Sequence, residues 1–247
     1  MDGLQAEVLG YLDGSILGPT ILANSGDLLQ VEFNNSLTEA SNIHWHGIFA
    51  PANMDGHPRD IVPAGGTKIY NFEILNRAGT YWYHPHPDMR TAEQAYGGLA
   101  GFLIVSDQEE QALLLPSGIY DIPLVIQDKN VDANGQFPYI LDSNDQKNGL
   151  LGNRVIINGL HAPFIEVNSG WYRFRLLNGS NARLYNLSFT NGYPMNIIGT
   201  DGGLLAYPEQ VNSIILSPGE RADILVDLSK LVAGDEFFLQ SEAFPGS

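Results

Sequence analysis

The sequence predicts an all-β protein made of two copies of one β-sandwich, and three observations carry that prediction. The 27 glycines and 14 prolines separate many short runs rich in Val, Ile, Tyr and Phe, which is typical of strands joined by frequent turns. Residues 19–26 and 163–170 share five of eight positions at a constant offset of 144, which extends without a gap to Asn34/Asn178. A chain of 247 residues is long enough for two domains of ordinary size.

The first copy is expected to contain strands on both sides of a loop rich in Pro, Gly and Asp. Alternating apolar residues predict strands at 16–22, 28–33, around 44–46, 67–74, 79–84 and 99–105, with one or two helical turns within 88–97. Charged residues gather at 107–111, where the pattern of strands breaks off. We therefore expect domain 1 at residues 1–106, a linker at 107–118 and domain 2 at 119–247.

The second copy is expected to keep the strands and to lack metal ligands. It begins with a strand at 122–127 and continues as short strands to about residue 241. The first copy carries His44 and His46, which are candidate metal ligands described below. The offset of 144 places Ser188 at the position of His44 and Thr190 at that of His46. His161 follows an Asn-Gly turn and is interpreted as a surface loop residue. Any metal chemistry is therefore expected in the first copy.

Composition excludes several classes of partner and of chemistry. The chain has 28 acidic and 12 basic residues, and its net charge of −16 argues against binding nucleic acid or an anionic membrane surface. No run reaches the roughly 18 apolar residues of a membrane span, and no signal peptide precedes Gly3. Without cysteine there is no disulfide, no thiolate nucleophile and no thiolate ligand.

Two His-x-His pairs stand out, because they hold four of the six histidines. They are His44-Trp45-His46 and His84-Pro85-His86. In a strand, residues i and i+2 point to the same face about 7 Å apart, so each pair presents two imidazoles together. Pro85 has no N–H and places the second pair at a strand end. One pair alone would be read as a polar strand face, but two pairs predict a metal site, since imidazole is a common ligand of copper and zinc.

The segments His44–Gly47 and Tyr83–His86 resemble the N-terminal half of the multicopper oxidases, the family of laccases, copper-efflux oxidases and bilirubin oxidases. The resemblance extends over nearly the whole chain, through residues 98–105, 157–159, 173–178, 201–203 and 217–223. It implies two tandem cupredoxin-like Greek-key β-sandwich domains, in agreement with the strand pattern. It also implies a copper-dependent oxidoreductase.

The resemblance implies a role for each histidine of the two pairs. His44 would ligate the type 2 copper, His46 and His84 one type 3 copper, and His86 the other. Asp55 matches the acidic residue that orders water near the type 2 copper and helps deliver protons. A carboxylate suits that role because the reduction of dioxygen to water consumes protons that metal-bound histidines cannot supply. Taken alone, Asp55 would be an Asp-Gly turn residue, and His57 is interpreted as a loop residue.

The chain departs from the family pattern because it has no cysteine and no third His-x-His pair. In the family, a last domain supplies the other half of the trinuclear cluster and the type 1 copper. We therefore expect this chain to be the N-terminal two-domain part of such an enzyme and to be inactive alone. The face bearing the four histidines should be exposed, or covered by the missing third domain or another chain. Contact with domain 2 would count against the assignment.

The expected parent couples one-electron oxidation of a phenol or metal ion to four-electron reduction of dioxygen to water. Its partners are dioxygen and a small electron donor, and its expected location is periplasmic or secreted, with the export signal outside this sequence. One alternative is a non-catalytic copper-binding or scaffold relative. A two-domain oxidase or nitrite-reductase-like enzyme would need a cysteine for its type 1 site. A zinc hydrolase is the remaining alternative.

Overall fold

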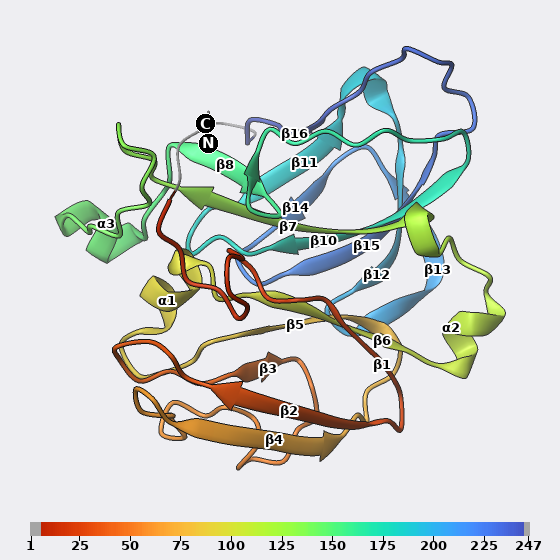
Figure 1. The fold of residues 1–247 in the computed structure, drawn as a ribbon. Helices are drawn as coiled ribbons and strands as arrows, with labels where there is room; N and C mark the ends of the chain where they lie inside the picture. The colour runs from red at the N-terminus through yellow and green to blue at the C-terminus, as the bar shows by residue number, and fades with distance from the viewer. Residues whose placement is uncertain (1–5, 245–247) are drawn as a thin grey trace.

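The computed structural model describes residues 6–244 and shows two β-sandwiches stacked on each other (Figure 1). The first sandwich, red to yellow-green in Figure 1, lies below the second, which is green to blue. The all-β prediction is confirmed, since strands make up most of the regular structure. Residues 1–5 and 245–247 of the expected domains lie outside the described residues. No helix within 6–244 has the length and apolar content needed to cross a bilayer.

The first sandwich packs a four-stranded sheet against a two-stranded one. The larger sheet has the order β1 (Ile21–Asn24), β6 (Gly101–Ser106), β5 (Gly79–His84), β3 (His44–His46), and the smaller sheet pairs β2 (Leu28–Asn34) with β4 (Thr67–Glu73). Trp45, Tyr83 and Leu103 from the larger sheet meet Tyr70 and Phe72 from the smaller one in a buried core. This core excludes water between the sheets and stabilises the sandwich.

The second sandwich packs a seven-stranded sheet against a three-stranded one. The larger sheet has the order β13 (Gly203–Val211), β12 (Met195–Thr200), β15 (Arg221–Asp227), β10 (Trp171–Asn178), β7 (Asp121–Lys129), β8 (Arg154–Ile157), β9 (Leu160–His161). The smaller sheet has the order β14 (Ile214–Leu216), β11 (Tyr185–Phe189), β16 (Leu239–Ser241). Phe174, Leu187 and Ile224 belong to a core separate from the first one. The division at residues 107–118 stays a prediction, which the separate cores support.

Short helices lie outside the two sandwiches. They are α1 (Thr91–Gly97), α2 (Gln108–Ala112), α3 (Ser143–Asn148), and the 3-10 turns η1 (Gly118–Tyr120) and η2 (Thr190–Gly192). The helical turns expected within 88–97 correspond to α1. The strand expected at 16–22 is wrong in its first part, because the strand begins only at Ile21. Pro19 offers no N–H for a ladder, and its carbonyl instead accepts the Tyr83 hydroxyl at 2.8 Å.

The internal repeat is real, but its expected register of 144 is wrong by one residue along β2 and β10. Leu29, Val31 and Phe33 of β2 face the first core, whereas Tyr172, Phe174 and Leu176 of β10 face the second. These sets are related by an offset of 143. A shift of one residue matters because it would turn every core side chain of a strand to the opposite face.

Two buried asparagines show the same corrected register. Asn35 Oδ1 accepts the Leu37 N–H at 3.1 Å, and Asn178 Oδ1 accepts the Ser180 N–H at 3.0 Å. The backbone carbonyl of each asparagine also accepts an N–H from a glycine, Gly65 or Gly219, at 2.8 Å. Asn35 therefore corresponds to Asn178, although the sequence aligns Asn34 with it.

The second copy keeps the strand at the position of the first histidine pair and lacks its histidines, as expected. Ser188 lies in β11 between the core residues Leu187 and Phe189, so its side chain points away from that core. Thr190 lies beyond the strand, in η2.

Strand β5 is buried on both faces because the two sandwiches meet on it. Tyr81 and Tyr83 point into the first core. Trp82 points the other way and joins Phe102 and Ile104 against Val125 and Leu177 of the second sandwich. Thr80, Trp82 and His84 therefore share the face of the sheet that turns toward the second sandwich.

A buried ionic cluster lies at this interface. Arg173 is 2.5 Å from both Glu110 and Asp223, and Arg175 binds Asp121 at 2.8 Å. Thr80 of β5 donates its hydroxyl to Asp223 at 2.5 Å, which connects the first sandwich to the cluster. Glu110 belongs to α2, so this one residue of the charged segment expected as a linker is buried at the interface, while Gln108, Glu109 and Gln111 are exposed.

Replacing Arg173 by Met should lower the free energy of unfolding by about 3 kcal/mol or more, because it leaves buried carboxylates with one cation fewer. Urea unfolding of both variants measures the effect. The matched control is Arg77→Met, which removes an exposed pair with Glu109 at 3.7 Å and should cost less than about 1 kcal/mol. Equal losses in the two variants would contradict a structural role for the buried cluster.

Lys129 is a buried cation at the other end of the interface. Its Nζ donates to the Tyr96 carbonyl at the end of α1 and lies 4.5 Å from the centre of the Tyr96 ring. Burial lowers the pKa of Lys129 to about 7, against an opposing effect of Asp128. The unfolded chain therefore binds more protons than the folded chain between the folded pKa and the ordinary lysine pKa.

The free energy of unfolding should rise with pH between about 7 and 9. The reason is that the folded-state pKa of Lys129 is depressed, so the unfolded chain takes up a proton first and stability is lost as the pH falls through that range. Lys129→Met should remove this slope in urea unfolding measured across the range. Lys147→Met, on the exposed surface of α3, should leave it in place. A slope that persists in Lys129→Met would show that another group causes it.

Candidate metal centre

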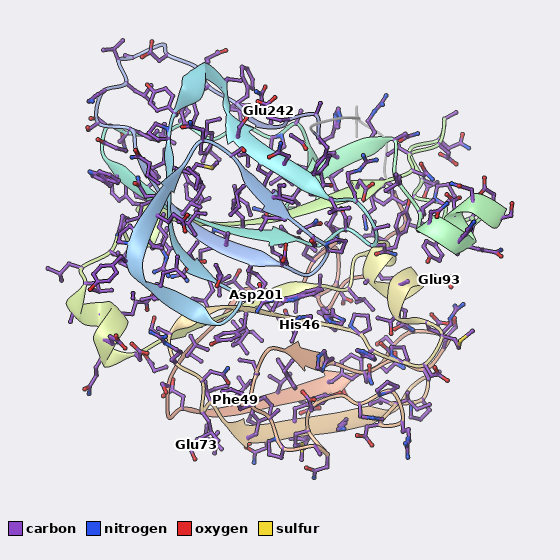
Figure 2. The ribbon with its side chains drawn as sticks, turned by 180° about the vertical axis from the view of Figure 1, so that it is seen from behind. His46, Phe49, Glu73, Glu93, Asp201 and Glu242 are labelled. Carbon is purple, nitrogen blue, oxygen red and sulfur yellow. The ribbon has the colours of Figure 1, made fainter. Side chains whose placement is uncertain are left out.

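The antiparallel pairing of β3 with β5 brings the two histidine pairs together. In this register His44 lies opposite His84, and His46 lies opposite Trp82. These four side chains consequently share one face of the sheet, while Trp45 and Tyr83 fill the core on the other face. Figure 2 labels His46 at the junction of the two sandwiches, below Asp201 of the second.

The imidazole nitrogens converge on one small volume. His44, His46 and His84 each offer a ring nitrogen, and these atoms lie within 4.8 Å of one another. His46 Nδ1 and His84 Nε2 face each other at 3.2 Å. Two nitrogens bound tetrahedrally to one ion at about 2.0–2.1 Å would lie roughly 3.3 Å apart. The pair is therefore spaced to share a metal ion.

His86 lies next to this group, near His44 and His84. Its ring centre is 5.3 Å from that of His44 and 6.0 Å from that of His84. Its Nδ1 is buried and has no hydrogen-bond partner among residues 6–244. A buried imidazole nitrogen without a partner has an unused ligand position.

Backbone carbonyls fix which nitrogen is free in two of the rings. His44 Nδ1 donates to the Asp55 carbonyl at 2.7 Å, and His84 Nδ1 donates to the Pro85 carbonyl at 2.8 Å. A carbonyl only accepts, so the proton sits on Nδ1 and the Nε2 lone pair remains free. This is the arrangement that orients a histidine for a metal.

Burial keeps two of the imidazoles neutral. It lowers the pKa of His84 to about 3, although the Pro85 carbonyl opposes the shift. It lowers the pKa of His46 to about 4, with further lowering by the Arg221 cation. Neutral imidazole is the ligand form, so protons do not compete for these nitrogens near neutral pH.

Trp82 holds the same two rings by direct ring contacts, stacked for His46 and tilted for His84. Its ring centre is 4.2 Å from that of His84 and 5.0 Å from that of His46. Because Trp82 itself is packed between the sandwiches, the ring positions of His46 and His84 depend on the interface. Trp82 was not singled out from the sequence, where it looks like any aromatic residue in a strand.

Asp55 lies beside His44, on the open side of the group. Its Oδ1 is 3.4 Å from His44 Nδ1, and its side chain is 39% exposed. Burial raises the pKa of Asp55, while His44, His86 and His57 act to lower it. His57 is exposed in the same loop, and its Nδ1 accepts the Arg59 N–H at 3.4 Å.

The expectation that domain 2 stays clear of the histidine face is wrong for His46. A Cβ placed on Gly219 of the second sandwich would lie 3.6 Å from both His46 Cε1 and Trp82. A Cβ placed on Gly47 would lie 3.2 Å from Nη2 of Arg221. The reason is that the histidines share their sheet face with Thr80 and Trp82, which pack against the second sandwich.

The group therefore has a closed side and an open side. His46 and His84 form the closed side, against Trp82 and the second sandwich. His44 and His86 form the open side, together with Asp55. His46 is partly exposed like His44 and His86, and His84 is the buried one of the four, so contact with Trp82 and the second sandwich is what defines the closed side. Among residues 6–244, the group His44, His46, His84 is the one set of three or more His, Asp or Glu residues arranged to hold a metal ion. His161 is exposed in β9 and belongs to no such set.

The chemistry of this donor set suits copper. It consists of imidazoles with free lone pairs, two of them at the spacing of a shared ion, and an uncoordinated nitrogen on His86. Imidazole binds copper and zinc well, and no described carboxylate points into the group as a ligand in place of a histidine.

Gly56→Ala should damage this site more than its position on a loop suggests. A Cβ at Gly56 would lie 1.9 Å from the Ile43 carbonyl oxygen and 2.8 Å from His44 Cα, so the loop carrying Asp55 must move away from His44. We expect a loss of about 1–3 kcal/mol beyond backbone strain, together with weaker Cu²⁺ binding. Urea unfolding and Cu²⁺ titration measure the two effects.

Gly65→Ala is the matched control. Gly65 has φ +73° and Gly56 has φ +72°, but a Cβ at Gly65 meets nothing within 4 Å. It should therefore show only the strain of a left-handed backbone, about 1–2 kcal/mol, with unchanged Cu²⁺ binding. Equal losses in both variants would mean that the contact with the His44 strand is unimportant.

Comparison with known proteins agrees with this geometry. Two profiles described as multicopper oxidase match the chain, over residues 1–110 and 130–244. The cell division protein FtsP of Shigella dysenteriae is 38% identical over 236 residues, and the multicopper oxidase mco of Staphylococcus haemolyticus is 36% identical over 226. These matches cover 95% and 92% of this chain but 49% and 50% of the relatives. The chain thus spans about half the length of the curated relatives it matches.

Solved structures show the same relationship. The McoA multicopper oxidase of Aquifex aeolicus superposes with a TM-score of 0.89 at 41% identity, over 97% of this chain and 54% of that chain. The laccase-like multicopper oxidase CueO of Ochrobactrum sp. gives a TM-score of 0.90 at 33% identity, over 97% and 56%. These structures match both sandwiches together, so the contact of domain 2 with His46 does not count against the assignment. The fold is thus two tandem cupredoxin-like β-sandwiches, and the chain belongs to the multicopper oxidase family.

Proposed function

We propose that the chain is the N-terminal two-domain part of a laccase-like multicopper oxidase. The parent enzyme couples one-electron oxidation of a phenol or metal ion to four-electron reduction of dioxygen to water. The observation that carries the proposal is the convergence of the two His-x-His pairs, with ring nitrogens of His44, His46 and His84 within 4.8 Å of one another. Copper bound at these nitrogens supplies the one-electron redox chemistry.

The four histidines are divided among three copper ions in this proposal. His46 and His84 would hold one type 3 copper together, which their 3.2 Å nitrogen separation supports. His44 would hold the type 2 copper through Nε2, because Nδ1 is engaged with the Asp55 carbonyl. His86 would hold the second type 3 copper, on the open side of the group.

Asp55 would deliver protons to this centre. Its carboxyl group lies 3.4 Å from His44 Nδ1 and is partly exposed, so it reaches both the site and solvent. Burial raises its pKa, which favours holding a proton that it can pass on. The imidazoles do not serve as proton donors while their nitrogens are bound to metal or carbonyl.

The site would be completed by another cupredoxin domain. Four imidazoles over three copper ions leave each ion under-coordinated, and a chain without cysteine has no thiolate for a type 1 site. Because the second sandwich covers His46, the completing domain, in the parent or on another chain, would approach from the side of His44 and His86. The isolated chain would then be inactive, and the parent would act in the periplasm or outside the cell.

A non-catalytic, scaffold-type function is the second candidate. It is favoured by the similarity to FtsP, a relative named as a cell division protein. Against it stands the pre-oriented geometry of the imidazoles, which a scaffold does not require. Metal binding separates the two candidates.

The experiment is a Cu²⁺ titration of the 247-residue chain with measurement of bound copper, followed by oxygen uptake with a phenol. The wild-type chain should bind copper, and His46→Asn and His84→Asn should each weaken binding at least about tenfold, because a ligand is lost. His161→Asn, in exposed β9, is the control and should bind like the wild type.

Absence of copper binding by the wild-type chain would overturn the oxidase proposal in favour of the scaffold. Sustained oxygen uptake by the isolated chain would overturn the claim that another domain completes the centre. Copper binding without oxygen uptake is the outcome that the proposal predicts.

A further inference from the structure

We propose that Asn42 is the positioning residue for the open side of the metal centre, where it fixes His86 and the loop of Asp55 relative to the strand of His44. This inference rests on the proposed function, because it assumes that the four histidines bind copper. Nothing in the two histidine motifs points to Asn42, which precedes the first motif by two residues.

One side-chain amide joins three segments of the chain. Asn42 Oδ1 accepts the His86 backbone N–H at 2.6 Å. Its Nδ2 donates to the Gly56 carbonyl at 3.1 Å and to the His57 carbonyl at 3.2 Å. Asn42 thus connects the start of β3, the turn after β5 and the loop that carries Asp55.

The three hydrogen bonds match the hydrogen-bonding groups of an asparagine side chain. The side chain supplies one acceptor and two donor hydrogens, and all are engaged. Asn42 is 0% exposed, so water does not replace a lost hydrogen bond. A serine at this position is too short to span the three groups, and an aspartate has no hydrogens for the two carbonyls.

The open side depends on Asn42 because it lacks the supports of the closed side. The rings of His46 and His84 both pack against Trp82, as described above. His86 has no partner at Nδ1 among the described residues, so its backbone hydrogen bond to Asn42 is a main restraint on its position. His44 is oriented by the Asp55 carbonyl, in the loop that Asn42 holds at the next two residues.

Asn35 provides a matched control within the same sandwich. It is also buried, and its amide also makes three hydrogen bonds to backbone groups, those of Leu37, Glu39 and Val62. None of these groups belongs to the metal centre. A comparison of Asn35 with Asn42 therefore separates general stability from placement of the ligands.

The experiment compares Asn42→Ala, Asn42→Ser and Asn35→Ala with the wild-type 247-residue chain. Thermal unfolding without metal should show similar losses of stability for Asn42→Ala and Asn35→Ala, because each substitution leaves buried backbone groups without hydrogen-bond partners. Cu²⁺ titration should show about 10–100-fold weaker binding for both Asn42 variants, the usual effect of removing a group that orients ligands. The Cu²⁺ affinity of Asn35→Ala should stay within about threefold of that of the wild type, because Asn35 orients no ligand.

The electron paramagnetic resonance spectrum of bound Cu²⁺ is the readout that a purely structural role would not move. It should change in the Asn42 variants and stay unchanged in Asn35→Ala. If Asn42→Ala does not fold, Asn42→Ser carries the comparison, since it leaves a smaller cavity and keeps a hydroxyl.

The outcomes distinguish this inference from the function on which it rests. Wild-type affinity and spectrum in a folded Asn42 variant would overturn the role of Asn42 and leave the copper site intact. Equal loss of affinity in Asn35→Ala would also overturn it, because the effect would then follow stability alone. A wild-type chain that binds no copper would overturn the proposed function and this inference with it.

Discussion

The pairing of β3 with β5 is the interaction on which the rest of the structure depends. Its register places His44 opposite His84 and turns Trp45 and Tyr83 into the core of the first sandwich. A slip of one residue would turn the histidines into the core of the first sandwich and turn Trp45 and Tyr83 out of it, so packing of the core enforces the geometry of the candidate metal centre. Binding and folding are in this way specified by the same two strands.

The second sandwich gives this centre two unlike sides. On the closed side, Trp82 and the loop at Gly219 pack against His46, and the ionic cluster around Asp223 holds the sandwiches together through Thr80. Burial keeps the pKa values of His46 and His84 low and their rings neutral. On the open side, His44 and His86 rely on hydrogen bonds from loops, and Asp55 reaches solvent.

Local patterns in the sequence were enough to predict the all-β class, the two sandwiches, most strands of the first one and the paired histidines. Alternating apolar residues and turn residues determine structure over a few positions, so they can be read from the sequence. The repeat was predicted one residue out of register along β2 and β10, since matching turn residues at Asn24 and Asn168 conceal a difference in the length of the turn. The cover over His46 was missed because it depends on how a distant sheet packs on β5. Asn42 was missed for the same reason, as its partners lie 14 to 44 residues away.

The central claim is that His46 Nδ1 and His84 Nε2 hold one copper ion between them. Anomalous diffraction at the copper edge, from crystals of the chain grown with Cu²⁺, tests it most directly. The account predicts an anomalous peak about 2.0–2.1 Å from each of these two nitrogens. Density for copper elsewhere, with these two nitrogens still facing each other without an ion, would contradict it.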